Sequence, residues 1–215
     1  MRVRRWRTRV TSLAVAGTVA AALTSGTAAS AEVRGTQSAA LPADLSCPDE
    51  NTLPPTGDSA QDRATRARIA EAVDCLINRT RFYEGIPTVE KHFGLKRAAQ
   101  DHADQSVQYK WWSNGDPHTN PVTGTTPEIR IRSAHYCSGT NLRFAEITYN
   151  GAGSASTAAA ALNWWLNIST GAHGAIIGDP TFVDMGVGVA PGVADTTITP
   201  SGNMATYVVD FGRCG

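Results

Sequence analysis

The stretches that decide the fold are residues 184–190, Asp-Met-Gly-Val-Gly-Val-Ala, and residues 206–211, Thr-Tyr-Val-Val-Asp-Phe. Both alternate valine with small or polar residues, which is the two-residue period of a β-strand. Residues 192–202 lie between them and suit a connection, because Gly and Pro favour turns. The pattern predicts two paired strands near the end of the sequence.

Helical patterns come before these strands. Three segments are predicted to be helices: residues 59–81, 95–109 and 155–167. Asp58 or Ser59 can cap the first of them. Residues 127–133 are predicted to be a short helix or a turn. Residues 145–149 are predicted to be a further strand. Helices followed by strands that one helix interrupts predict an α+β fold.

The first 31 residues have the pattern of a signal peptide. Five arginines precede an Ala-rich apolar run, and Ala29-Ser30-Ala31 fits the site at which a signal peptidase cleaves. The apolar run is too short for a permanent membrane anchor, so we expect no membrane span. The sequence predicts a secreted, extracellular protein, and leaves both Sec and twin-Arg export open. Residues 32–60 are expected to be an extended Pro/Ser-rich leader, and residues 61–215 the folded domain.

The net charge is unevenly divided along the chain. The whole sequence has 19 basic and 19 acidic residues. Without residues 1–31 it has 14 basic residues and still 19 acidic ones, a net charge of about −5. This balance argues against nucleic acid as a partner, because such binding depends on positive charge.

Four cysteines, an even number, favour disulfide bonds in an exported protein. Three pairings of Cys47, Cys75, Cys137 and Cys214 are possible. We favour Cys47–Cys75, which would tether the leader to the first helix, and Cys137–Cys214, which would hold the last residues to the domain. The spacing contains no CxxC pair, which argues against a cysteine zinc site.

The candidate functional residues are two histidines and a carboxylate. His118 lies in a long Gly- and Pro-rich loop, and His173 lies between Gly171 and Gly174. Glu146 lies on a predicted strand among apolar neighbours, where a buried carboxylate needs partners. Such a set can bind a divalent cation such as Zn²⁺, or can form a hydrogen-bonded network without metal. We expect a core or supporting role for His102.

Short motifs follow one another through residues 66–212. They are Ala72-Val73 to Asn78, Arg79 and Arg81; His102-Ala103; Pro127-x-x-Arg130; Ala145-Glu146-Ile147-Thr148; Trp165 to His173; Asp179-Pro180-x-Phe182; and residues 185–189. Their joint order resembles the CAP superfamily of cysteine-rich secretory, antigen 5 and pathogenesis-related proteins. The resemblance is strongest to the secreted bacterial branch with an SCP domain.

The resemblance implies a three-layer α–β–α sandwich with a central, mainly antiparallel sheet. In many members two His and two Glu line a cleft that can hold a divalent cation. His118, Glu146 and His173 match three of these four residues, and Asn167 stands in the region of the fourth. Because Asn is no carboxylate base, the tetrad is incomplete.

Three functions remain open from the sequence. The first is binding of a divalent cation, a lipid or another small extracellular ligand in this cleft, with His118 and His173 as the metal ligands. The second is a metal-dependent extracellular hydrolase, similar to a peptidase, with Glu146 as ligand or base. The third is a non-catalytic interaction module whose polar cluster braces the fold. The sequence leaves open whether the protein is an enzyme and what its oligomeric state is.

Overall fold

The computed structural model describes residues 46–169 and 171–215. The predicted signal peptide lies outside the described residues, as does the predicted leader up to residue 45. The domain boundaries expected after residues 31 and 60 therefore stay predictions. None of the helices in the described ranges is long and apolar enough to cross a membrane.

A mixed four-stranded sheet lies at the centre of the described part of the chain. Its strands are β1 (Glu90–Lys91), β2 (Leu142–Ala152), β3 (Asp184–Pro191) and β4 (Met204–Cys214), in the order β1-β3-β4-β2. β4 pairs antiparallel with both β2 and β3, and the two residues of β1 pair parallel with β3. The strands predicted from residues 184–190 and 206–211 are thus confirmed as an antiparallel pair.

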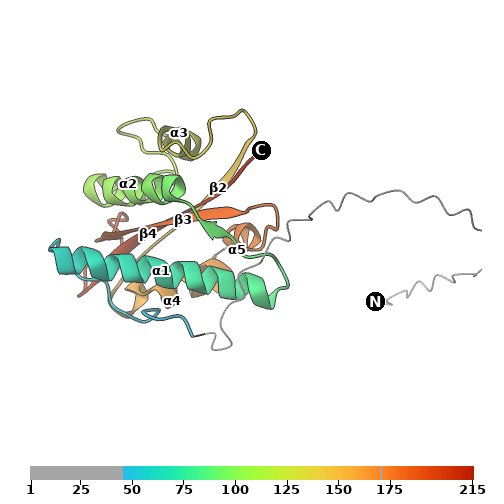
Figure 1. The fold of residues 1–215 in the computed structure, drawn as a ribbon. Helices are drawn as coiled ribbons and strands as arrows, with labels where there is room; N and C mark the ends of the chain where they lie inside the picture. Colours follow the sequence, from blue (N-terminus) through green and yellow to red (C-terminus); the bar gives the residue numbers. More distant parts are fainter. Residues whose placement is uncertain (1–45, 170) are drawn as a thin grey trace, which may run out of the picture. The chain divides into compact units, whose positions relative to one another are not determined.

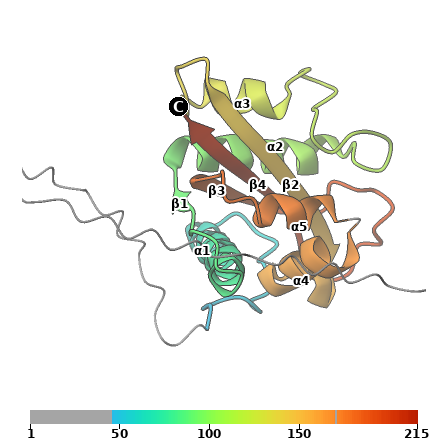
Figure 2. The same cartoon turned by 90° about the vertical axis from the view of Figure 1, so that its right-hand side faces the viewer.

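Helices cover both faces of this sheet. They are α1 (Ala60–Tyr83), α2 (Phe93–Tyr109), α3 (Pro127–Ser133), α4 (Ala158–Asn163) and α5 (Ala172–Ile177). Figure 1 shows α1 and α2 on opposite sides of the strands, and Figure 2 shows α3 on the side of α2 and α4 on the side of α1. The predicted α+β fold with a mainly antiparallel central sheet is confirmed.

Local side-chain chemistry explains where α1 begins. The Ser59 hydroxyl accepts a hydrogen bond from the Asp62 backbone N–H at 3.1 Å, and the Asp62 carboxylate accepts one from the Ser59 N–H at 3.0 Å. This reciprocal capping box satisfies two N–H groups that have no partner within the helix. Of the two caps considered from the sequence, Ser59 is the one used.

The prediction of a single helix for residues 155–167 is wrong, because the segment is divided into three elements. The structure has a 3₁₀ turn (Gly153–Ser156), then α4, then a π-helical turn (Trp164–Ile168). The Thr157 hydroxyl accepts from the Ala160 N–H and starts α4 afresh, which breaks the helix from the preceding turn. The π turn includes the fully buried Trp165, whose indole N–H donates to the Thr148 carbonyl on β2 at 2.9 Å. β1 and α5 are too short to carry a readable period, and the sequence pattern did not predict them.

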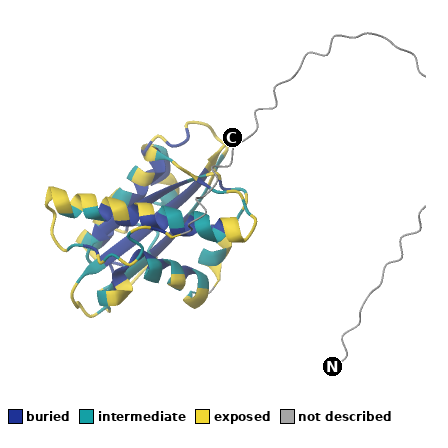
Figure 3. Ribbon diagram, turned by 60° about the horizontal axis from the view of Figure 1, so that its bottom comes forward, coloured by how far each residue is buried: buried dark blue, intermediate teal, exposed yellow. Residues whose placement is uncertain are grey.

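The glycines of β3 let α2 lie directly on the sheet. A Cβ atom on Gly186 would come within 2.0 Å of the Lys96 backbone, and one on Gly188 within 2.4 Å of the Ala99 backbone. The valines between and after them, Val187 and Val189, belong to the core on the α1 side. The glycines of β3 therefore face α2, where the backbones come close together, and the valines face the core beneath α1. In Figure 3 the strands are mostly dark blue, whereas the helices carry yellow on their outer sides.

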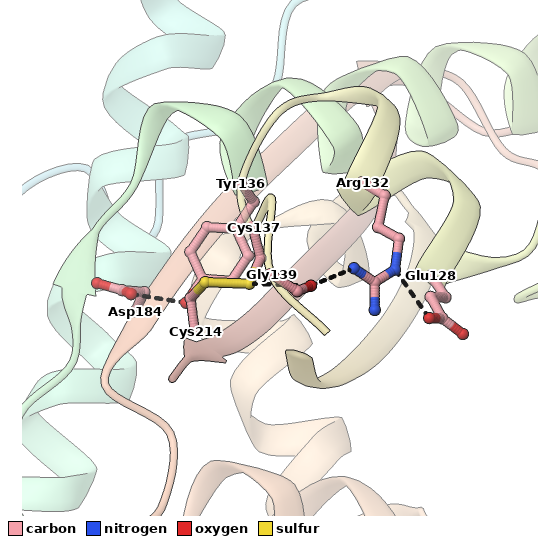
Figure 4. The surroundings of a disulfide bond; sticks show 7 residues. All are labelled: Glu128, Arg132, Tyr136, Cys137, Gly139, Asp184 and Cys214. Atoms are coloured by element: carbon pink, nitrogen blue, oxygen red, sulfur yellow. Dashed lines mark hydrogen bonds and ion pairs between the residues drawn. A yellow bond between two sulfur atoms is a disulfide. The ribbon is translucent and has the colours of Figure 1, made fainter. Parts of the chain in front are cut away.

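Both favoured disulfides are present. Cys47 is bonded to Cys75 of α1, and Cys137 to Cys214 at the end of β4. Figure 4 shows the second bond beside Tyr136, whose hydroxyl donates to Asp184 at 2.6 Å. These two contacts hold the segment after α3 to β4 and β3.

Candidate functional site

A buried polar cluster lies where β2 and β4 meet α2 and α3. Glu146 of β2 is directly opposite Asp210 of β4 in the strand register. Opposed residues of an antiparallel pair point to the same face of the sheet. His102 of α2 and Arg130 of α3 are also buried, and both contact Glu146.

Glu146 is the centre of this cluster. One carboxylate oxygen accepts from the Arg130 guanidinium at 2.6 Å, and the other accepts from Nδ1 of His118 at 2.8 Å. Nε2 of His102 lies 3.7 Å from the second oxygen. The Glu146 side chain is only 1% exposed, so its charge is balanced inside the protein rather than by water.

The two opposed carboxyl groups hold opposite protonation states. Burial acts to raise the pKa of Glu146, but the hydrogen bond from His118 and the positive charge of Arg130 outweigh it, so the pKa is lowered. Burial, and then the negative charge of Glu146, raise the pKa of Asp210 well above its usual range. A side-chain hydrogen bond between Asp210 and Glu146 acts in the same direction, because only the protonated acid can donate it. Glu146 is therefore the carboxylate and Asp210 the neutral acid.

Arg130 and His102 also hold the loop that carries His118. Arg130 donates to the backbone carbonyls of Thr125 at 2.9 Å and His118 at 3.0 Å. Nε2 of His102 is 2.9 Å from the Pro117 carbonyl, to which it must donate because a carbonyl only accepts. Burial lowers the pKa of His102, which keeps its ring neutral. The supporting role expected for His102 agrees with these contacts.

His118 is the accessible member of the cluster. Its side chain is 33% exposed, compared with 1% for Glu146. An ionised carboxylate can only accept a hydrogen bond, so the contact with Glu146 requires a proton on Nδ1 of His118. In the neutral form of the ring Nε2 then carries a lone pair, and no hydrogen bond from the residues that the structure describes reaches it. Glu146 thus orients the ring so that Nε2 can accept from a ligand.

His173 lies on α5, whose position is fixed by the buried Arg81. The Arg81 guanidinium donates to the carbonyls of Ile177, Asp179 and Phe182 around the end of that helix. The His173 ring lies 5.1 Å from the Trp164 ring. Burial is the main cause that lowers the pKa of His173, and the proximity of His118 acts in the same direction. His173 is therefore a neutral, partly buried neighbour of His118. Among the described residues it makes no hydrogen bond to Glu146.

Asn167 lies apart from these groups. It is exposed, and its amide donates to Asn163 on the preceding turn at 3.0 Å. Among the described residues, no hydrogen bond joins it to His118, Glu146 or His173. The structure thus brings His118 and Glu146 into contact and places His173 near them.

A cavity of about 310 Å³ lies along β2; we call it the edge pocket, because β2 is an outer strand of the sheet. It is lined by Trp112, Pro117, Thr148, Tyr149, Asn150, Trp164, Asp195 and Ile198. Pro117 precedes His118 in the chain, and Trp164 contacts His173. A neighbour of each histidine therefore lines the edge pocket, although neither His118 nor His173 is itself among the lining residues.

The residues present do not fit a catalytic zinc ion. Such sites use three protein ligands and an open position. Within residues 46–169 and 171–215, no group of three or more His, Cys, Asp or Glu side chains is placed to hold a metal ion. Both oxygens of Glu146 already accept from Arg130 and His118, which leaves two imidazoles, His118 and His173.

Two members of the cluster were not singled out as site residues from the sequence. Arg130 entered only through the P-x-x-R motif, and Asp210 not at all. Asp210 stands between Val209 and Phe211 in a strand pattern. A carboxylate among apolar neighbours needs partners, so this pattern marks Asp210 as a candidate in the same way as Glu146.

Comparison with known proteins gives fold-level neighbours only. No family model matches the chain, and no curated protein matches its sequence. An extracellular SCP-domain protein from Bacillus anthracis is 19% identical over 73% of this chain and 44% of that chain, with a TM-score of 0.49. An outer surface protein from Borrelia burgdorferi is 21% identical over 67% of this chain and 92% of that chain, with a TM-score of 0.45.

The first of these neighbours is much longer than its match here, since this chain spans less than half of its length. The name of this neighbour mentions an SCP domain, the domain that the sequence motifs resemble. The α+β fold itself rests on the strand pairing and helix layers described above.

Proposed function

We propose that this chain is an exported binding protein that holds a small extracellular ligand in the edge pocket, against Nε2 of His118. The observation that carries the proposal is the 2.8 Å contact between Nδ1 of His118 and Glu146. This contact orients an accessible imidazole, and Pro117, the residue before it in the chain, lines the cavity.

The rigidity of the site supports binding. Glu146 is held by the buried Arg130, and the loop before His118 is held by His102 through the Pro117 carbonyl. A ligand that donates a hydroxyl or N–H proton to His118 would meet an acceptor that is already oriented. Preorganisation of this kind lowers the entropic cost of binding.

Two disulfides support export. Both bonds close long loops, of 28 and 77 residues, and no cysteine in the described part of the chain is free. Structural disulfides persist in oxidising compartments and are rare in the cytosol. The N-terminal pattern of residues 1–31 supports the same location.

The donor set argues against the hydrolase that uses metal-bound water. That mechanism needs a set of metal ligands, and no group of three or more His, Cys, Asp or Glu side chains within residues 46–169 and 171–215 is placed to hold a metal ion. If the chain is instead an interaction module without a small ligand, nothing should bind at His118. The titration described next tests this alternative as well.

The experiment is a ¹⁵N NMR titration of the mature protein with small alcohols, amines, carboxylates and saccharides. We expect at least one class to shift the signals of Trp164 and the His118 ring saturably. His118→Ala should weaken that binding about fivefold, the worth of one hydrogen bond. His92→Asn is the matched control, because Asn keeps the helix cap that His92 provides by accepting from the Gly94 N–H.

Three results would overturn the proposal. The first is the absence of any saturable shift near His118. The second is calorimetric Zn²⁺ binding of about micromolar affinity or tighter that both His118→Ala and His173→Ala abolish. The third is turnover of peptides or esters that depends on Glu146.

A further inference from the structure

Three aromatic side chains form walls of the edge pocket, and two of them have their polar atoms bonded to the protein. The indole N–H of Trp112 donates to the Ser106 hydroxyl at 3.1 Å. The hydroxyl of Tyr149 donates to the Ala155 carbonyl at 2.7 Å. The Trp164 ring lies 5.6 Å from the Tyr149 ring. These side chains therefore offer mainly ring surface to a ligand.

The pocket has a single charged lining residue, Asp195. One oxygen of its carboxylate accepts from the Thr197 N–H at 2.8 Å and from the Thr197 hydroxyl at 2.7 Å. No Lys or Arg is among the lining residues. His173, behind Trp164, is neutral because its pKa is lowered by burial. The pocket thus combines aromatic surface with one uncompensated negative charge.

We propose that the edge pocket takes an organic cation, a methylated ammonium group held by the rings of Trp112, Tyr149 and Trp164 and by the carboxylate of Asp195. Aromatic rings carry negative charge on their faces, and Trp attracts a cation most strongly. A methylated ammonium has a diffuse charge with no strong hydrogen-bond demand, so it suits a site whose Trp112 and Tyr149 polar tips are already bonded. The proposal rests on the proposed function, because it names the class of ligand for the same pocket.

Size agrees with this ligand class. The cavity of about 310 Å³ is at the lower end of the range of small-molecule sites. A small quaternary ammonium compound such as choline would fill it, whereas a lipid chain or an extended peptide would project beyond it. The remaining polar side chains, Thr148 and Asn150, line the same cavity and can serve a hydroxyl group of the ligand.

The test compares choline with its uncharged isostere 3,3-dimethylbutan-1-ol by calorimetry and NMR on the mature protein. We expect choline to bind about tenfold more tightly than the isostere. Asp195→Asn, which keeps the acceptor for Thr197, and Trp164→Leu should each weaken choline about fivefold and leave the isostere within about twofold. The matched control is Asp101→Asn, since Asp101 is an exposed carboxylate that lines a different cavity.

The ratio of the two affinities separates charge recognition from general damage to the pocket. Equal binding of choline and the isostere, or a ratio unchanged in Asp195→Asn and Trp164→Leu, would overturn the proposal. Saturable binding of a saccharide in place of choline would overturn the cation and leave the proposed function standing. If no probe binds at all, both fail, and thermal unfolding of each variant reports whether the variants are folded.

Discussion

Asp210→Asn should stabilise the protein, by an amount that grows as the pH rises. Asp210 is fully buried, and it faces Glu146 across the β2–β4 pair. Burial and the charge of Glu146 raise its pKa, so the native state holds a proton on Asp210 that the unfolded state loses above about pH 4. The native state therefore binds more protons than the unfolded state above that pH, and stability falls as the pH rises.

The magnitude follows from linkage. A carboxyl group that keeps its proton only in the native state costs about 1.4 kcal/mol for each pH unit above its unfolded pKa. The loss stops growing once the pH passes the raised native pKa. Asn has the same shape as protonated Asp, cannot ionise, and can donate an N–H to Glu146. The variant should therefore match the parent near pH 4 and exceed it progressively toward neutral pH.

The assay is urea unfolding of the parent and Asp210→Asn at several pH values and constant ionic strength. Asp101→Asn serves as the exposed control and should change stability by less than about 0.5 kcal/mol. A stability difference between parent and Asp210→Asn that does not depend on pH would refute the assignment of the proton to Asp210. So would a variant that is less stable than the parent at neutral pH.

Three further variants probe the charges and crosslinks. Burial raises the pKa of Asp74 to about 7, so Asp74→Asn should gain on the order of 3 kcal/mol between pH 4 and 7 in urea unfolding, and no gain would contradict the shift. Glu146→Gln should cost about 3–5 kcal/mol because it leaves the buried Arg130 without a counter-ion, and a cost below about 1 kcal/mol would show that the pair is not desolvated. Replacing Cys137 and Cys214 by Ser should cost about 4.5 kcal/mol for a 77-residue loop, and an unchanged thermal midpoint would argue against a structural role for that bond.

The fold was predictable where the side-chain period was clear. The Gly-Val alternation of residues 184–190 identified β3, and the apolar spacing after Ser59 identified α1. The prediction failed where local caps compete with propensity, as at Thr157, and where an element is too short for its period to show, as in β1 and α5.

The site was predictable in part. A carboxylate among apolar residues pointed correctly to Glu146, but its partner Arg130 comes from another helix, and a contact across layers has no period in the sequence. The place of Asp210 in the site depends on strand register, because only the pairing of β2 with β4 puts it opposite Glu146. Asn167 was expected in the cleft from the resemblance, and the π turn that contains it leaves it exposed beside Asn163.

The most direct test of the account is the tautomer of His118, because the proposed function depends on Glu146 presenting Nε2 to the edge pocket. Long-range ¹⁵N–¹H NMR of the neutral imidazole distinguishes the two nitrogens. We expect the proton on Nδ1, with Nε2 unprotonated, and a mixture of tautomers in Glu146→Gln. A parent protein with the proton on Nε2 would contradict the account, because that nitrogen could then no longer accept from a ligand.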